Sequence, residues 1–156
     1  FPDTEILIEN RCGSVYHGGK FILSKMKDVA ALCESIESKS QRLRIAFDVP
    51  QIYTAHNAST EDKYLTLLQE AKTYRSFIGG VHLWGKSYSL TGRKVSHCGD
   101  LNSYFVNQNV KECFLEAFAD CFNDNMARKM VLEVNSGNDD LSSIISDLLS
   151  VGIKFV

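Results

Sequence analysis

The stretch Ile78-Gly79-Gly80-Val81-His82-Leu83-Trp84 is an apolar run interrupted by one histidine. Three other apolar runs end in a carboxylate, namely Ile6-Leu7-Ile8-Glu9, Arg44-Ile45-Ala46-Phe47-Asp48 and Met130-Val131-Leu132-Glu133. Short β-branched and aromatic runs separated by helix-length segments are typical of parallel strands in an α/β protein. Barrel-type α/β enzymes carry their chemistry at the carboxyl ends of such strands. The sequence therefore predicts that the four polar side chains converge on one point.

Segments with helical periodicity lie between and after these strands. They cover residues 24–38 with Ser24 as N-cap, a segment that follows Thr60, residues 110–123, and a segment capped by Asp139 or Asp140 that ends at Gly152. Residues 153–156 are expected to be extended. This alternation predicts right-handed parallel crossovers. Four or five such units make up about half of an eightfold barrel, which takes ~250 residues. We expect an α/β fold, a partial (half) TIM barrel, with residues 1–156 as one domain.

Three connections are expected to be irregular. A glycine-bearing loop follows Glu9, and Pro50 is expected to end the second strand because proline cannot donate to a ladder. Residues 85–102 form a polar loop, and a loop of that length in a compact domain is usually functional or disordered. The chain has no dinucleotide-binding glycine fingerprint and no phosphate-binding loop.

Composition excludes several classes of protein. The chain has 156 residues, 44% of them hydrophobic, which is enough for one core, and a net charge of −2 gives no global signature of a nucleic-acid binder. No apolar stretch reaches the roughly 18 residues needed to cross a bilayer. Five cysteines without a Cys-x-x-Cys pair disfavour disulfides and a zinc knuckle, and Cys33, Cys113 and Cys121 are expected in helices as core residues. A reducing, cytoplasmic compartment fits best.

The strand-end residues suggest a metal site. Taken singly, an acidic residue at a strand end often caps the next element, and a lone histidine in a strand is more often a core residue. Together, two glutamates, an aspartate and a histidine suit a divalent cation such as zinc, manganese, cobalt or magnesium. His97 in the long loop is expected to add a ligand or a substrate contact, whereas His17 and His56 are expected to be solvated.

Short motifs occur in a fixed order along the chain. They are Ile8-Glu9-Asn10, Gly18-Gly19-Lys20-Phe21, Asp48-Val49-Pro50-Gln51, His82-Leu83-Trp84-Gly85-Lys86, Arg93-Lys94-Val95-Ser96-His97 and Leu132-Glu133-Val134-Asn135. In this order they resemble the carboxyl-terminal half of the endonuclease IV-like and xylose isomerase-like TIM barrels, over nearly the whole chain. The resemblance implies a set of metal ligands: Glu9, Asp48, His82, Glu133 and, as a ligand or a substrate contact, His97.

Two departures from the endonuclease IV pattern bear on the number of metal ions. Gln51 stands where that family has the histidine of an Asp-x-x-His motif, and Val95 stands where it has an aspartate. In endonuclease IV-type enzymes those two residues, with the loop histidine, hold one of three zinc ions, and two further histidines come from the first half of the barrel. The resemblance therefore implies a divalent metal, with zinc first among the candidates, in a reduced centre.

The resemblance implies two enzymatic functions. The first is a phosphodiesterase that acts on abasic or damaged DNA, with Lys86, Arg93 and Gln51 as substrate contacts. The second is a single-metal sugar isomerase or epimerase, in which Glu9 and Glu133 exchange protons with carbons beside a carbonyl. A third reading is a non-catalytic barrel half that binds a partner. Each needs a second half-barrel, from an upstream segment or a second copy, because half a barrel leaves open sheet edges. No membrane partner is expected.

Overall fold

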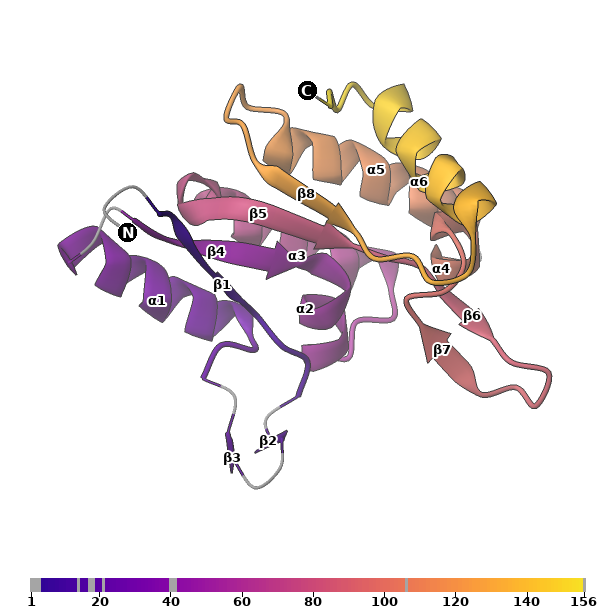
Figure 1. Cartoon of the computed structure of the whole chain (residues 1–156), viewed down its shortest axis with the longest axis horizontal. Helices are drawn as coiled ribbons and strands as arrows, with labels where there is room; N and C mark the ends of the chain where they lie inside the picture. Colours follow the sequence, from indigo (N-terminus) through magenta and orange to yellow (C-terminus); the bar gives the residue numbers. More distant parts are fainter. Residues whose placement is uncertain are drawn as a thin grey trace.

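The computed structural model describes residues 4–13, 15–16, 19–20, 22–39, 42–105 and 107–155. Its centre is a four-stranded parallel sheet in the order β1-β4-β5-β8 (Figure 1). These strands, Ile6–Glu9, Leu43–Asp48, Ile78–Leu83 and Lys129–Leu132, are the four that the sequence predicted. Neighbours in the sheet follow chain order and are parallel, so a crossover connection joins each strand to the next. His17, Gly18 and Phe21 of the glycine loop lie outside the described residues.

Helices alternate with the strands of the central sheet. They are α1 (Met26–Lys39), α2 (Val49–Ala55), α3 (Glu61–Thr73), a 3-10 turn η1 (Arg75–Phe77), α4 (Leu101–Phe105), α5 (Gln108–Phe122) and α6 (Asn138–Ser150). Two small antiparallel pairs, β2 (Val15–Tyr16) with β3 (Gly19–Lys20) and β6 (Lys86–Tyr88) with β7 (Lys94–Ser96), project from the body of the domain (Figure 1).

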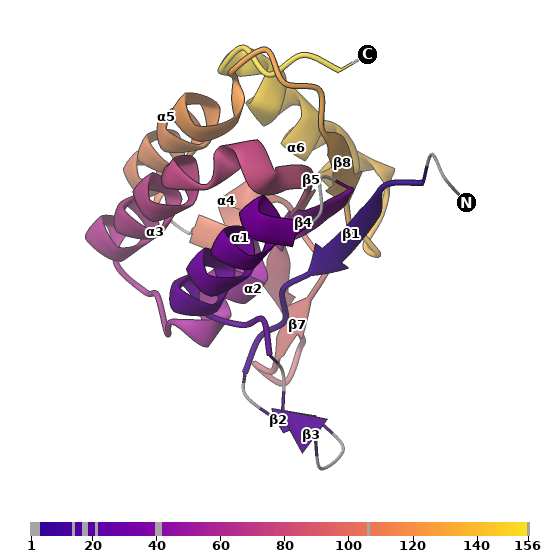
Figure 2. The ribbon, with the colours of Figure 1, turned by 90° about the vertical axis from the view of Figure 1, so that its left-hand side faces the viewer.

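The hydrophobic core lies between the sheet and the helices. Figure 2 shows α1, α3 and α5 together on one side of the sheet. Ile45, Phe47, Val81 and Leu83 are each 0–1% exposed and belong to one core cluster with Leu67, Leu68, Phe114 and Phe118 from α3 and α5. Alternate strand residues point to opposite faces, so the other face carries the intervening positions. On that face Val131 remains 39% exposed.

The strand register places the candidate site residues on that second face. Glu9 is paired with Ala46, Ala46 with Gly80, and Asp48 with His82. Paired residues share a face, as do residues two apart along a strand. His82 is paired with Val131 on β8, two residues before Glu133, whose N–H continues the ladder by donating to Leu83 O at 3.1 Å. The four predicted side chains thus leave the sheet on one face and at one end.

Several sequence predictions about the connections were wrong. Pro50 does not simply end a strand, because a helix, α2, begins at Val49 and proline fits the first turn, where N–H groups have no acceptor within the helix. Helix α1 begins at Met26, not after Ser24, because the Asp28 carboxylate accepts from the N–H groups of Ser24 and Lys25. Residues 85–102 contain the β6–β7 hairpin and the start of α4 instead of an irregular loop.

Predictions for the last helix and the core have mixed outcomes. The predicted cap at Asp139 or Asp140 is wrong, because α6 begins at Asn138 with Gly137 as its N-cap. Gly152 follows α6 with a φ of +84°, a conformation that glycine adopts without strain. Residues 153–155 form no strand, although they were expected to be extended. Cys33 and Cys121 are buried in helices α1 and α5, and Cys113 in α5 is half-buried. None of the described helices is long and apolar enough to cross a membrane.

Hydrogen bonds from Arg128, which directly precedes β8, connect the start of this strand to β5. Its side chain is 5% exposed and pairs with the Asp124 carboxylate. Its guanidinium also donates to the carbonyl oxygens of Ile78, Phe122 and Arg75, each at 3.1 Å. The hydrogen bonds that Arg128 donates to the Asp124 carboxylate lower the pKa of Asp124 to about 2. The start of β8, and with it the position of Glu133, depends on this one buried cation.

Replacing Arg128 with methionine should lower the free energy of unfolding by about 1–3 kcal/mol at pH 7, because Asp124 keeps only Arg75 as a cationic partner among the described residues and the carbonyl oxygens of Ile78 and Phe122 lose their donor. The pKa of Asp124 is depressed in the folded chain, so its stabilising effect is present above the unfolded value of about 4 and is lost as pH falls toward about 2. Urea denaturation should show that the difference in free energy of unfolding between wild type and variant becomes smaller as pH falls through that range. The exposed Arg93→Met serves as control, and equal effects of both variants would contradict this role.

Candidate metal centre

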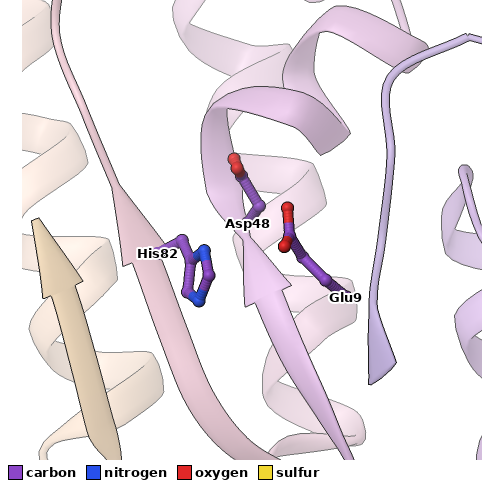
Figure 3. A group of neighbouring side chains, drawn as sticks. All are labelled: Glu9, Asp48 and His82. Carbon is purple, nitrogen blue, oxygen red and sulfur yellow. The ribbon is translucent and has the colours of Figure 1, made fainter. Parts of the chain in front are cut away.

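Three of the predicted ligands lie within reach of one cation. Glu9 ends β1, Asp48 ends β4 and His82 lies in β5. A ligand atom from each lies within 4.8 Å of the others. Figure 3 shows the two carboxylates side by side with the imidazole facing them. Asp48 is buried, and the other two are partly exposed, so the cluster is open to solvent on one side. Within the described residues this is the one group of His, Cys, Asp or Glu with such geometry.

Glu133 reaches the cluster through the two histidines. Its Oε1 lies 3.2 Å from His82 Nδ1, and its Oε2 lies 2.9 Å from His97 Nδ1. Its side chain is 27% exposed. The structure therefore brings together the whole strand-end set that the sequence singled out, with Glu133 bridging His82 and His97. His97 is separated from the other three ligand candidates by Glu133.

One atom of His82 marks the site as a place for a ligand. Nδ1 is buried and has no hydrogen-bond partner among the described atoms, since the nearby Glu133 oxygen at 3.2 Å is not aligned for a hydrogen bond. Buried polar atoms are nearly always paired. A buried nitrogen without a hydrogen-bond partner, on a residue that is grouped with two carboxylates, fits a divalent cation, which carboxylate and imidazole groups bind together.

Asp48 is the most constrained member of the cluster. It is 0% exposed, and its two oxygens accept hydrogen bonds from the backbone N–H of Gln51 (2.9 Å), Gln51 Nε2 (2.8 Å) and the indole N–H of Trp84 (3.0 and 3.2 Å). Burial raises the pKa of Asp48 and outweighs the hydrogen bonds from Trp84 and Gln51, which lower it. The carboxylate is thus costly to keep charged and gains from a nearby cation.

Gln51 stands where the sequence resemblance led us to expect a histidine. It is 5% exposed, and its Nε2 donates to both Glu9 Oε1 (3.0 Å) and Asp48 Oδ2 (2.8 Å). Its Oε1 accepts from the backbone N–H of Cys12 at 2.8 Å. The amide therefore ties the two carboxylates to each other and to the loop after β1. Its polar atoms are already engaged inside the site, so the predicted contact of Gln51 with substrate remains a prediction.

Two supporting residues were not predicted. Asn10, 0% exposed, brackets the backbone of Asp48 by donating to its carbonyl at 3.0 Å and accepting from its N–H at 2.8 Å. Trp84 was expected only as the end of a strand. Besides donating to Asp48, its ring stacks on His97, with 4.4 Å between the ring centroids and 20° between the planes. The sequence did contain an indication for Asn10, because a residue that directly follows Glu9 lies at the same carboxyl end of the sheet as Asp48.

The loop that carries His97 is held over Trp84 by a close backbone approach. A Cβ at Gly85 would lie 2.1 Å from the carbonyl oxygen of Gly99, so only glycine fits there. The His97 carbonyl also accepts from the Asn135 N–H at 2.7 Å, which joins this loop to the segment after Glu133. His97 itself has a φ of +59°, an uncommon value for a residue other than glycine. The segment that was predicted as a long loop thus contributes His97 to the site, and the Gly85–Gly99 and His97–Asn135 contacts fix its position.

The remaining predicted contacts lie on the β6–β7 hairpin. Lys86 begins β6 and is half-buried, and Arg93 lies in the exposed turn before β7. Neither touches the ligand cluster directly. Comparison of the chain with known protein families and with characterised proteins finds no match. Functional inference therefore rests on the site itself.

Replacing Gln51 with methionine should raise the pKa of Asp48 further, because the amide hydrogen bond to the Asp48 carboxylate is lost and Glu9, which loses its own bond to the amide, repels Asp48 at close range. Cys12 also loses the acceptor for its N–H, so the free energy of unfolding should fall by about 1–3 kcal/mol. Carboxyl ¹³C NMR titration and urea denaturation measure the two effects. Gln69→Met, at an exposed site on α3, is the control. An unchanged titration of Asp48 would contradict the bridging role of Gln51.

Proposed function

We propose that this chain is the catalytic part of a single-metal isomerase or epimerase that acts on a sugar-like substrate. The observation that carries the proposal is the convergence of Glu9, Asp48 and His82, with Glu133 3.2 Å from a buried His82 Nδ1 that has no hydrogen-bond partner among the described residues. Four such residues are a full set for one cation. Gln51, at the position of a histidine ligand in the trinuclear enzymes, offers those carboxylates an amide instead.

The arrangement of the four residues suits proton transfer between neighbouring carbons. When bound, a divalent cation polarises substrate oxygens and so acidifies the adjacent C–H bonds. Asp48 and His82 belong to the inner strands β4 and β5, whereas Glu9 and Glu133 belong to the outer strands β1 and β8. The two glutamates therefore flank the centre from opposite sides. Their side chains are 30% and 27% exposed, so each is accessible as a base or an acid to a substrate in the site.

A second candidate is hydrolysis of a phosphodiester in abasic or damaged DNA. The observation that favours it is the cationic hairpin beside the site, where Lys86, Arg93 and Lys94 lie within nine residues. Cations at this position suit an anionic substrate. Gln51 and Val95 weigh against it, because both replace ligands of the third zinc ion in the resembling enzymes.

We also propose that the sheet is half of a TIM barrel. Four parallel strands in sequential order, with helices on one side and polar strand-end residues on the other face, are what half of such a barrel contains. The open edges β1 and β8 would pair with a second half-barrel, from a longer chain or from a second copy. Partly exposed Val131 on the uncovered face supports this pairing.

Metal binding tests the centre directly. Titration of Mn²⁺ or Zn²⁺ into apo-protein, followed by calorimetry, should give about one equivalent. Glu133→Gln and Asp48→Asn should each weaken binding about 10–100-fold or more, because each removes an anionic oxygen from the centre. Glu116→Gln, at an exposed position on α5, should bind as wild type does. Two or three zinc equivalents would favour the phosphodiesterase, and unchanged affinity in Glu133→Gln would overturn the convergent site.

Activity separates the candidate reactions. Aldose–ketose interconversion, assayed with Mn²⁺ over a panel of sugars, should depend on both glutamates. Glu9→Gln and Glu133→Gln should each lower kcat about 10²–10⁴-fold, the contribution expected of a general acid or base. Glu116→Gln again serves as control. Cleavage of an oligonucleotide with an abasic site, in the absence of isomerisation, would replace the first candidate with the second. If metal-loaded wild-type protein shows neither activity, the result would favour a non-catalytic module.

A further inference from the structure

Lys86 is held in an unusual setting for a lysine. It is the first residue of β6, only two positions after Trp84, and it is half-buried. Its Nζ lies 3.9 Å from the centroid of the Tyr104 ring. Tyr104 belongs to α4 and is itself 6% exposed. The ring therefore forms a rigid platform that fixes the ammonium group through a cation–π contact.

A second lysine approaches Lys86 from the other strand of the hairpin. Tyr88 is paired with Lys94 in the antiparallel register, and Lys86 lies two residues before Tyr88, so Lys86 and Lys94 are diagonal neighbours on one face. Burial and, after it, the charge of Lys94 together lower the pKa of Lys86 to about 8. Among the described residues neither lysine forms an ion pair with a carboxylate.

Two aromatic rings connect the lysine pair to the candidate metal centre. The Trp84 ring packs edge-on against Tyr104, with 6.3 Å between their centroids, and the same indole donates to Asp48. One aromatic pair thus separates the Lys86 ammonium from the Asp48 carboxylate. A substrate that extends from the centre past the Trp84–Tyr104 pair would reach the hairpin. The two ammonium groups repel each other until an anion lies between them.

We propose that Lys86 and Lys94 bind a phosphate group of the substrate, so that the site accepts phosphorylated compounds. This deepens the proposed function, on which it rests, by naming the substrate class. A phosphate ester carries up to two negative charges and several acceptor oxygens, which two ammonium groups on one face satisfy together. The phosphate group belongs either to a sugar monophosphate or to a nucleic-acid backbone, and the test distinguishes these sources.

The test uses inorganic phosphate and metal-free protein in EDTA, so that the metal centre does not contribute. Calorimetry of the wild type should show saturable binding in the millimolar range. Lys86→Met and Lys94→Met should each weaken binding at least about tenfold, since each removes one charge-assisted contact. Lys86→Arg should retain binding, because it keeps the charge. Lys27→Met, on the exposed part of α1, should bind phosphate as wild type does.

Absence of saturable binding, or equal affinity in wild type and Lys86→Met, would overturn the proposal. Circular dichroism of each variant confirms folding, and Lys86→Arg provides a second comparison should Lys86→Met unfold. Ribose 5-phosphate and a single-stranded oligonucleotide are titrated in parallel. Tighter binding of the monophosphate supports a sugar phosphate, and tighter binding of the oligonucleotide supports a nucleic-acid backbone. Mn²⁺ titration of the same variants should give wild-type affinity, so failure of phosphate binding is distinguishable from failure of the metal centre.

Discussion

Keeping the Asp48 carboxylate charged inside the protein is the constraint on which the rest of the site depends. A fully buried carboxylate is unfavourable unless hydrogen bonds or charges compensate for the water it has lost. Here the Gln51 side chain, the Gln51 backbone and Trp84 provide part of that compensation, while Asn10 fixes the backbone N–H and C=O of Asp48. The same carboxylate is the N-cap of α2. One side chain therefore ends a strand, begins a helix and faces the candidate cation.

The neighbours of Asp48 transmit this constraint to the rest of the molecule. Gln51 connects it to Glu9 and, through the Cys12 N–H, to the loop after β1. Trp84 connects it to His97 and to Tyr104. The centre is thus supported by residues from β1, α2, the end of β5 and the hairpin region. Such support holds ligands in place before a cation or substrate arrives, which is a general requirement of precise sites.

Much of the fold and the clustering of the strand-end residues could be predicted from the sequence because the signals were local. Each of the four central strands is an apolar run with a polar end, and the parallel arrangement brings those ends together. What could not be predicted depends on tertiary contacts. Pro50 is compatible with a strand end and with a helix start, and only the Asp48 cap decides between them. Residues 85–102 appear featureless in sequence, yet the Gly85–Gly99 contact folds them back on the sheet edge. Hydrogen bonds between residues such as Gln51 and Glu9, 42 positions apart, leave no periodic pattern.

The place of Trp84 has a consequence for how this molecule can be observed. It is the one tryptophan of the 156 residues, so the ultraviolet emission of the protein originates almost entirely at this point. Its indole touches a candidate ligand through its N–H and a histidine through its ring face. Protonated imidazole and paramagnetic ions such as Mn²⁺ and Co²⁺ quench a nearby indole. The chain therefore carries an intrinsic optical probe at its own centre, sensitive to what binds there without any label.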